Sequence, residues 1–201
     1  MITDTIPLFP QGLICCNLGL DNDRLINLIE RDLNYDLEGS AYYLTKESNL
    51  HEQEDYAWFT SSIQEQVQQV FDDVYEYVDV EPYITEMWGT VCEHGNFVHS
   101  HTHPNSFMSG VYYPEDADNA PIRFHNPLVK TLQPAVRFEN LYNMNSFVLC
   151  PQRGTLILFP SYLQHETKPW LADDVRRYSV AFNVFIRGTV GHDALASLKL
   201  S

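Results

Sequence analysis

Three of the eight histidines in the chain stand two residues apart, at His99, His101 and His103. In an extended strand, residues i and i+2 point to the same face and lie about 6.6 Å apart along the backbone. Two neutral imidazoles at this spacing can converge on one ion, because ring nitrogens bind zinc-like ions at about 2.0–2.1 Å. The spacing therefore predicts a metal site on this segment.

Only two of these histidines can share one ion in a straight strand, because His99 and His103 lie about 13 Å apart along it. His101 belongs to both possible pairs. Pro104 keeps the residue before it in the extended region, so the position of His103 is more predictable than that of His99. We therefore expect His101 and His103 as ligands, with His99 as the alternative to His103.

The length and the charge of the chain limit its class. At 201 residues the chain suits one domain with a sizeable core. It carries 12 Lys and Arg residues against 27 Asp and Glu residues, which gives a net charge of −15. This charge repels phosphate backbones and anionic lipid surfaces, which disfavours nucleic acid and membranes as partners.

Two further features predict a cytoplasmic protein. No apolar run approaches the roughly 18 residues that span a bilayer, and the first residues lack the pattern of a secretory signal.

The four cysteines show no metal-binding spacing and are too few for a disulfide scaffold, so we expect reduced thiols at Cys15, Cys16, Cys92 and Cys150.

Two segments in the first half of the chain have helical periodicity. Residues 21–34 place apolar side chains at three- and four-residue spacing, with Asp21 or Asn22 available as the N-cap. Residues 62–77 form a second amphipathic pattern, in which Ser62 and the glutamate three residues later fit a capping box. Both helices are expected to pack against a sheet.

Beyond residue 78 the sequence changes to short segments rich in β-branched and aromatic residues, separated by Pro and Gly. Regularly spaced short strands of this kind indicate a β-sandwich or a β-barrel. The expected strands are 83–92, 107–113, 122–125, 136–139, 145–149, 155–159 and 176–186. We also expect an edge strand or extended lead-in over 5–18, and a loop with short extended pieces over 35–58.

The strand expected over 176–186 alternates in an informative way. One face carries polar and small residues and the other carries Tyr, Val and Phe. An antiparallel strand normally turns its polar face to solvent. The same pattern also fits a barrel with a polar interior whose outside is packed beneath helices. The two amphipathic helices favour this second interpretation, which turns Arg177, Ser179, Ala181 and Asn183 inward.

A single histidine, His165, follows an uninterrupted apolar strand and a Phe-Pro break. A lone histidine is most often a surface residue or a hydrogen-bonded core residue. It gains meaning from Arg177, which follows twelve residues later with room for a turn between them.

Three blocks of sequence, taken together in order, resemble a known family. They are His-x-His-Pro-x-Ser-x-x-Ser-Gly-Val-Tyr-Tyr over 101–113, Gly-x-Leu-Ile-Leu-Phe-Pro-Ser-x-Leu-x-His over 154–165, and Arg-x-Ser-x-x-Phe-Asn over 177–183. The combination is similar to a family of 2-oxoglutarate/iron(II) oxygenases found in bacteria and marine phages. The opening Pro-Leu-Phe-Pro at 7–10 also resembles the family's start, so the resemblance covers most of the chain.

The resemblance implies a mainly β fold, the double-stranded β-helix or jelly roll, with two supporting N-terminal helices. It implies one domain over 1–201, with helical support over 20–80 and the jelly-roll core over 81–187. It implies that His101, His103 and His165 bind the metal. It further implies that Arg177 and Ser179 hold the far carboxylate of 2-oxoglutarate, a role that suits the planar guanidinium of arginine.

The activity implied by the resemblance is that of a dioxygenase with the cofactors Fe(II) and 2-oxoglutarate. Such an enzyme uses O2 to oxidise a C–H bond of a small molecule or a protein side chain, and it releases succinate and CO2. The phage members extend the expectation to a phage-encoded protein that acts in the host cytoplasm.

One position departs from the wider superfamily, where two histidines and one carboxylate hold the iron. Here His103 occupies the place of the expected Asp or Glu. Either three histidines form the site, or a carboxylate joins from Glu93, Glu115 or Asp116. Two other functions therefore stay open: a three-histidine cupin-type metalloenzyme without 2-oxoglutarate, such as a zinc hydrolase, and a non-catalytic jelly-roll binding module.

Overall fold

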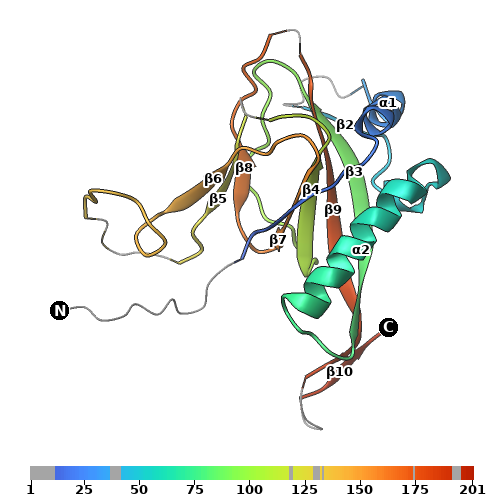
Figure 1. The fold of residues 1–201 in the computed structure, drawn as a ribbon, viewed down its shortest axis with the longest axis vertical. Coiled ribbons are helices and arrows are strands. Elements are labelled where there is room, and N and C mark those ends of the chain that lie inside the picture. The colour runs from blue at the N-terminus through green and yellow to red at the C-terminus, as the bar shows by residue number, and fades with distance from the viewer. Residues whose placement is uncertain are drawn as a thin grey trace.

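Two antiparallel β-sheets face each other in the computed structural model, and two helices cover the outer face of the larger sheet (Figure 1). The structure describes residues 12–36, 42–117, 120–128, 132, 134–173, 175–191 and 196–201. This arrangement is the jelly roll with two supporting helices that the sequence predicts.

The larger, or major, sheet consists of strands that are far apart in the sequence. Its order is β1-β7-β4-β9-β3-β2, and β10 pairs with the end of β9. The bounds are β1 Ile14–Asn17, β2 Tyr43–Leu44, β3 Val80–Cys92, β4 Met108–Tyr113, β7 Thr155–Pro160, β9 Arg177–Val190 and β10 Leu198–Leu200. The minor sheet has the order β6-β5-β8, with β6 Ser146–Leu149, β5 Ile122–His125 and β8 His165–Thr167.

The first helix, α1 (Asn22–Asp32), begins where the sequence predicts. The Asp21 carboxylate caps it by accepting a hydrogen bond from the backbone N–H of Arg24 at 3.0 Å. The second helix, α2 (Ala57–Asp73), follows two short 3₁₀ turns over Leu50–Glu52 and Glu54–Tyr56. Neither helix is both long and apolar enough to cross a membrane.

The capping box predicted at Ser62 is wrong. This residue lies inside α2, and its hydroxyl donates to the carbonyl of Trp58 one turn earlier. The helix starts sooner because its apolar stripe continues upstream to Phe59, which is completely buried. Burial of that ring outweighs the local cap pattern, since a cap contributes only about 1 kcal/mol.

The faces of β9 are arranged as the alternation predicts. Val180 and Phe182 lie in the core between the helices and the outer face of the major sheet, together with Leu25 of α1 and Ile63 of α2. The intervening residues of β9 therefore face the minor sheet. A second apolar cluster fills the space between the two sheets, and it contains Val111, Tyr113, Ile122, Phe124, Ile157 and Phe159.

Other predicted elements had mixed outcomes. No strand forms over 136–139, where the Val136 and Phe138 side chains are 47% and 77% exposed and no neighbouring strand pairs with them. β-propensity alone cannot form a strand without a partner. The short strands β8 and β10 were not predicted. Of the expected lead-in over 5–18, residues 14–17 form β1, and 1–11, with the Pro-Leu-Phe-Pro motif, lie outside the described residues.

The motif glycine Gly110 lies in β4, with the Phe182 ring directly above it. A Cβ atom at this position would overlap that ring and lie 2.7 Å from Cδ2 of Leu158. We predict that Gly110→Ala lowers the free energy of unfolding by about 1–3 kcal/mol, because the core must shift to admit a methyl group. Urea denaturation with its m value measures the change. The matched control is Gly19→Ala, where a Cβ meets nothing within 4 Å; equal effects of the two substitutions would contradict the packing argument.

Candidate metal centre

Residues 98–103 run beside β8 as an extended segment outside the named strands. Backbone hydrogen bonds join His101 and His165 in both directions, at 3.0 and 2.9 Å. The N–H of Thr167 donates to the carbonyl of Val98, and the N–H of His103 donates to the carbonyl of Ser161. This pairing places His101 opposite His165, with His103 two residues further along the same segment.

The side chains of His101, His103 and His165 converge. One ring nitrogen from each lies within 4.8 Å of the other two, and the Nε2 atoms of His103 and His165 are 3.3 Å apart. Two nitrogens that each bind one ion at about 2.1 Å, at tetrahedral or octahedral angles, are about 3.0–3.4 Å apart. The structure thus brings together the three histidines that the resemblance singles out.

Backbone carbonyls fix the protonation of two of these rings. Nδ1 of His101 lies 2.7 Å from the carbonyl oxygen of His99, and Nδ1 of His165 lies 2.9 Å from that of Leu163. A carbonyl oxygen only accepts, so each Nδ1 carries the proton and each Nε2 keeps a lone pair. Metal-binding histidines commonly have this arrangement, in which the second nitrogen donates to a carbonyl.

Burial keeps His103 and His165 uncharged at neutral pH. It lowers the pKa of His165 to about 3 and that of His103 to about 4, and the neighbouring histidines lower both further. The hydrogen bonds that His165 donates to the carbonyl of Leu163 and His103 donates to Asn183 oppose these shifts without reversing them. Neutral imidazoles are the form that binds metals, so these two side chains can bind a cation without first releasing protons.

The alternatives to these ligands do not join the cluster. His99 is exposed, its ring packs edge-on against Phe97, and only its backbone carbonyl reaches His101. Glu93 pairs with Arg176 at 2.7 Å. Asp116 accepts from the backbone N–H of Arg153, and burial raises the pKa of its neighbour Glu115.

Arg177 is buried on the inner face of β9 with only 2% of its surface exposed. Its guanidinium donates to the carbonyl of Ala120, to Sγ of Cys92 and to Oγ1 of Thr167, and its Nε has no partner. Among the described residues, no carboxylate pairs with it, whereas Arg176 forms two such pairs. A buried cation is costly without an anion, so this position calls for an anionic ligand.

Ser179 lies two residues further along β9, buried on the same face as Arg177. In the neighbouring β3, Cys92 pairs with Arg177 and Thr90 pairs with Ser179. The predicted pair therefore shares one polar wall of the space between the sheets.

Sequence reasoning missed a polar network behind His103. The Asn183 side chain hydrogen-bonds His103 and Glu86, and Ser109 and Ser161 continue the network. The sequence offered one signal, because Asn183 ends the third sequence block and shares the inner face of β9. Nothing in the sequence pointed to Glu86.

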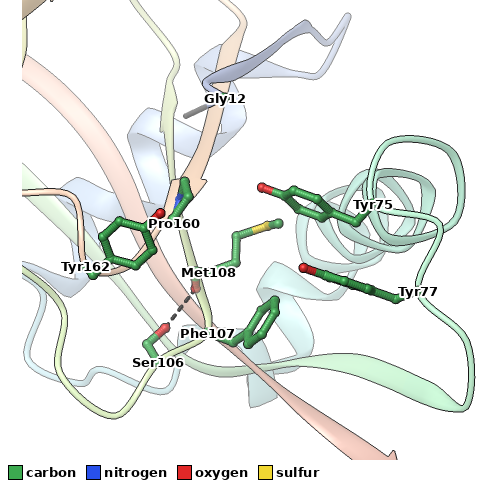
Figure 2. Close-up of a pocket in the computed structure, with 8 residues that line it drawn as sticks. All are labelled: Gly12, Tyr75, Tyr77, Ser106, Phe107, Met108, Pro160 and Tyr162. Carbon is green, nitrogen blue, oxygen red and sulfur yellow. Dashed lines mark hydrogen bonds between the residues drawn. The ribbon is translucent and has the colours of Figure 1, made fainter. Parts of the chain in front are cut away.

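A separate hollow of about 480 Å³ lies on the helix side of β4 (Figure 2). Figure 2 shows Tyr75 and Tyr77, from the segment after α2, facing Met108 and Pro160 across it, with Tyr162 beside Pro160. Neither the three histidines nor Arg177 line this hollow, so it is not the metal centre.

A jelly roll with converging imidazoles and a buried arginine between its sheets fits the class of mononuclear metal enzymes built on this fold. Residues 86–183, just under half of the chain, match the model of the family described as "Putative 2OG-Fe(II) oxygenase". All three sequence blocks lie within this range. A search of proteins with curated functions finds no significant match.

Several solved structures share the fold. HygX from Streptomyces hygroscopicus, with nickel, 2-oxoglutarate and hygromycin B bound, is 13% identical with a TM-score of 0.61, and the match covers 87% of this chain and 82% of HygX. A Pseudomonas putida prolyl-4-hydroxylase is 15% identical (TM-score 0.57, 86% and 92% covered). A Trichoplax adhaerens prolyl hydroxylase in complex with a peptide fragment is 14% identical (TM-score 0.60, 87% and 84% covered).

The match to the family model bears out the predicted enzyme class, a 2-oxoglutarate/Fe(II) oxygenase, and with it the predicted cofactors Fe(II) and 2-oxoglutarate. The solved structures bear out the predicted fold. The residues that bind these cofactors are inferred from the geometry.

The lowered pKa values of His103 and His165 predict how the stability of the metal-free protein depends on pH. The unfolded chain binds protons at these residues below about pH 6.5, whereas the folded protein does so only near pH 4 and pH 3. Stability is therefore fully present above about pH 6.5 and falls as the pH drops towards 4. In EDTA, His165→Asn, which retains a donor for Leu163, should show a shallower loss of melting temperature between pH 7 and 4.5 than the wild type. Parallel curves would contradict the shifted pKa of His165.

Proposed function

We propose that the protein is an Fe(II)- and 2-oxoglutarate-dependent dioxygenase that hydroxylates its substrate and releases succinate and CO2. The observation that carries this proposal is the buried Arg177, without a carboxylate partner among the described residues, close to three converging imidazoles. A metal centre alone would not need that cation. A metal centre that also binds a dianion would.

The metal ligands in this proposal are His101, His103 and His165. Three neutral ligands leave the bound ion one unit more positive than the two-histidine, one-carboxylate set does, which strengthens its attraction for an anionic cosubstrate. Imidazole nitrogens suit Fe(II), and three ligands leave further coordination positions open.

The geometry between the histidines and Arg177 supports the proposed 2-oxoglutarate site. Arg177 donates to Thr167, which stands two residues from His165 on β8 and on the same face. That spacing corresponds to about 6.6 Å along the strand. An extended five-carbon diacid spans such a gap, so one end can reach the ion while the far carboxylate meets Arg177 and Ser179.

The remaining inner residues shape the reaction space. Phe124 and Phe159 pack their rings beside His165, and Val111 and Ile157 complete this wall. An apolar surround excludes bulk water and strengthens the attraction between Arg177 and a carboxylate. When bound, Fe(II) with 2-oxoglutarate supplies the oxidising chemistry. The protein positions the reactants, supplies the positive charge of Arg177 and excludes water.

The substrate in this proposal is a small molecule or a protein side chain. Both kinds occur among the structural neighbours, because HygX was crystallised with hygromycin B and the Trichoplax enzyme with a peptide fragment. The net charge of −15 disfavours polyanions. We further propose that the chain works as a single domain in the cytoplasm, with a phage-encoded role as part of the same hypothesis.

We predict that the protein with Fe(II), ascorbate and 2-oxoglutarate releases succinate, and that Arg177→Met removes this activity. Methionine keeps most of the side-chain volume and the fold but lacks the charge, so the far carboxylate loses its partner. Loss of one member of a buried charged pair costs about 2–5 kcal/mol, which corresponds to a 30- to 5,000-fold rise in the Kd for 2-oxoglutarate. Isothermal titration of the Ni(II)-loaded protein measures that Kd.

The matched control is Arg153→Ala, which removes a guanidinium that is paired with Asp23 on the surface. It should leave the Kd unchanged. If Arg177→Met keeps metal-dependent turnover on a broad substrate pool, a three-histidine enzyme without 2-oxoglutarate replaces this proposal. If neither the wild type nor any variant turns over and 2-oxoglutarate does not bind, the non-catalytic binding module replaces it.

A further inference from the structure

We propose that Asn183 is a positioning residue for the metal ligand His103, and that the carboxylate of Glu86 acts through it. The three residues form a chain of carboxylate, amide and imidazole, which we call the 86–183–103 chain. The proposal rests on the proposed function, because it gives His103 the role of a metal ligand. The three histidine ligands carry no negative charge. In this proposal the carboxylate of Glu86, behind His103, supplies one.

The direction of the Asn183 amide follows from its partners. Its Nδ2 lies 2.9 Å from Oε2 of Glu86, and its Oδ1 lies 3.0 Å from Oγ of Ser109. A carboxylate only accepts hydrogen bonds, so the NH2 group must face Glu86 and the oxygen must face the opposite way. The amide cannot flip without placing two acceptors against each other.

The oxygen of Asn183 therefore accepts a hydrogen bond from a ring N–H of His103. Nε2 of His103 faces Nε2 of His165, so the ring nitrogen that donates to Asn183 is Nδ1. This leaves two lone pairs facing each other at 3.3 Å, since Leu163 already takes the Nδ1 proton of His165. Two acceptors at that distance have no proton to share, and a cation between them resolves the conflict.

A β-bulge explains how Glu86 reaches this position. The pairing of β3 with β9 shifts between Ile84 and Glu86, so Thr85 is an extra residue and Glu86 stands opposite Asn183. Ile84 lies in the core beneath the helices, and without the bulge Glu86 would point the same way. Bulges commonly redirect a side chain next to an active site.

Buried hydroxyls hold the amide from its other side. Ser109 and Ser161 are 0% and 1% exposed, their Oγ atoms are 2.8 Å apart, and Ser161 also contacts Ser106. Asn183 itself is 6% exposed. A buried amide with every partner fixed cannot rotate freely, so it transmits the orientation set by Glu86 to the ring of His103.

The chain has an electrostatic consequence for the metal. Three neutral imidazoles do not compensate the charge of a divalent ion. A carboxylate that acts through a polarised amide makes Nε2 of His103 a better donor, as carboxylate partners of ligating histidines do. Glu86 thereby compensates the charge of the ion indirectly, whereas in the wider superfamily a carboxylate ligand does so directly.

The test compares full-length variants in two measurements. Long-range ¹H–¹⁵N NMR of the metal-free protein reports the tautomer of each histidine, and a chelator competition gives the Kd for Ni(II). In the wild type we expect the Nδ1–H tautomer at His103. We expect Asn183→Ala to give mixed tautomers at His103, to leave His165 unchanged and to weaken Ni(II) binding about 10- to 100-fold.

Two further variants separate charge and structure. Glu86→Gln keeps the shape at an exposed position but removes the charge, and it should weaken Ni(II) binding about fivefold, because charged hydrogen bonds are roughly twice as strong as neutral ones. The matched control is Asn49→Ala, which removes an amide that donates to the carboxylate of Glu52 on the surface, and it should bind Ni(II) within twofold of the wild type.

Each other result has a defined meaning. If Asn183→Ala keeps the wild-type tautomer and binds Ni(II) within twofold of the wild type, the positioning role is overturned. If Glu86→Gln matches the wild type, Glu86 has no part in it. His101→Ala tests the underlying metal centre separately: unchanged Ni(II) binding in this variant would remove the proposed function itself.

Discussion

Coverage of one face of β9 by helices is the constraint on which the rest of the structure depends. Val180 and Phe182 are buried beneath α1 and α2, and each large apolar side chain contributes about 1.5–3 kcal/mol when it is fully buried. Because successive residues of a strand alternate, this burial forces Arg177, Ser179 and Asn183 into the space between the sheets. The hydrophobic effect on the outside of the sheet thus creates the polar interior.

The charged and lone-pair groups of that interior lack charged partners within the described part of the protein. Burial holds the imidazoles of His103 and His165 neutral, with free lone pairs, and it surrounds Arg177 with neutral partners. Such an arrangement costs stability in the empty protein, since neither the lone pairs nor the guanidinium has a charged counterpart. A cation and a dianion together would satisfy both, and their binding would stabilise the folded state by mass action.

Irregular parts of the backbone place two of the three proposed metal ligands and the Glu86 side chain. His101 and His103 lie in a segment outside the named strands, and Glu86 faces Asn183 only because of the bulge at Thr85. Regular strands would have placed these side chains by strict alternation. The extra residue in β3 and the single bridge between His101 and His165 replace that rule with one specific geometry.

The sequence by itself determined the helix around 22–32, most strands from their short apolar segments, the inward face of β9, and the residue types that could form the centre. Local spacing carries this information because helical and strand periods are properties of neighbouring residues. Tertiary structure decided the early start of α2, the absence of a strand at 136–139, the exclusion of Glu93 from the cluster and the approach of Glu86 to Asn183. Each of these depends on a partner that is distant in the chain. Local periodicity does not report such contacts, because their free energy depends on the assembled sheet.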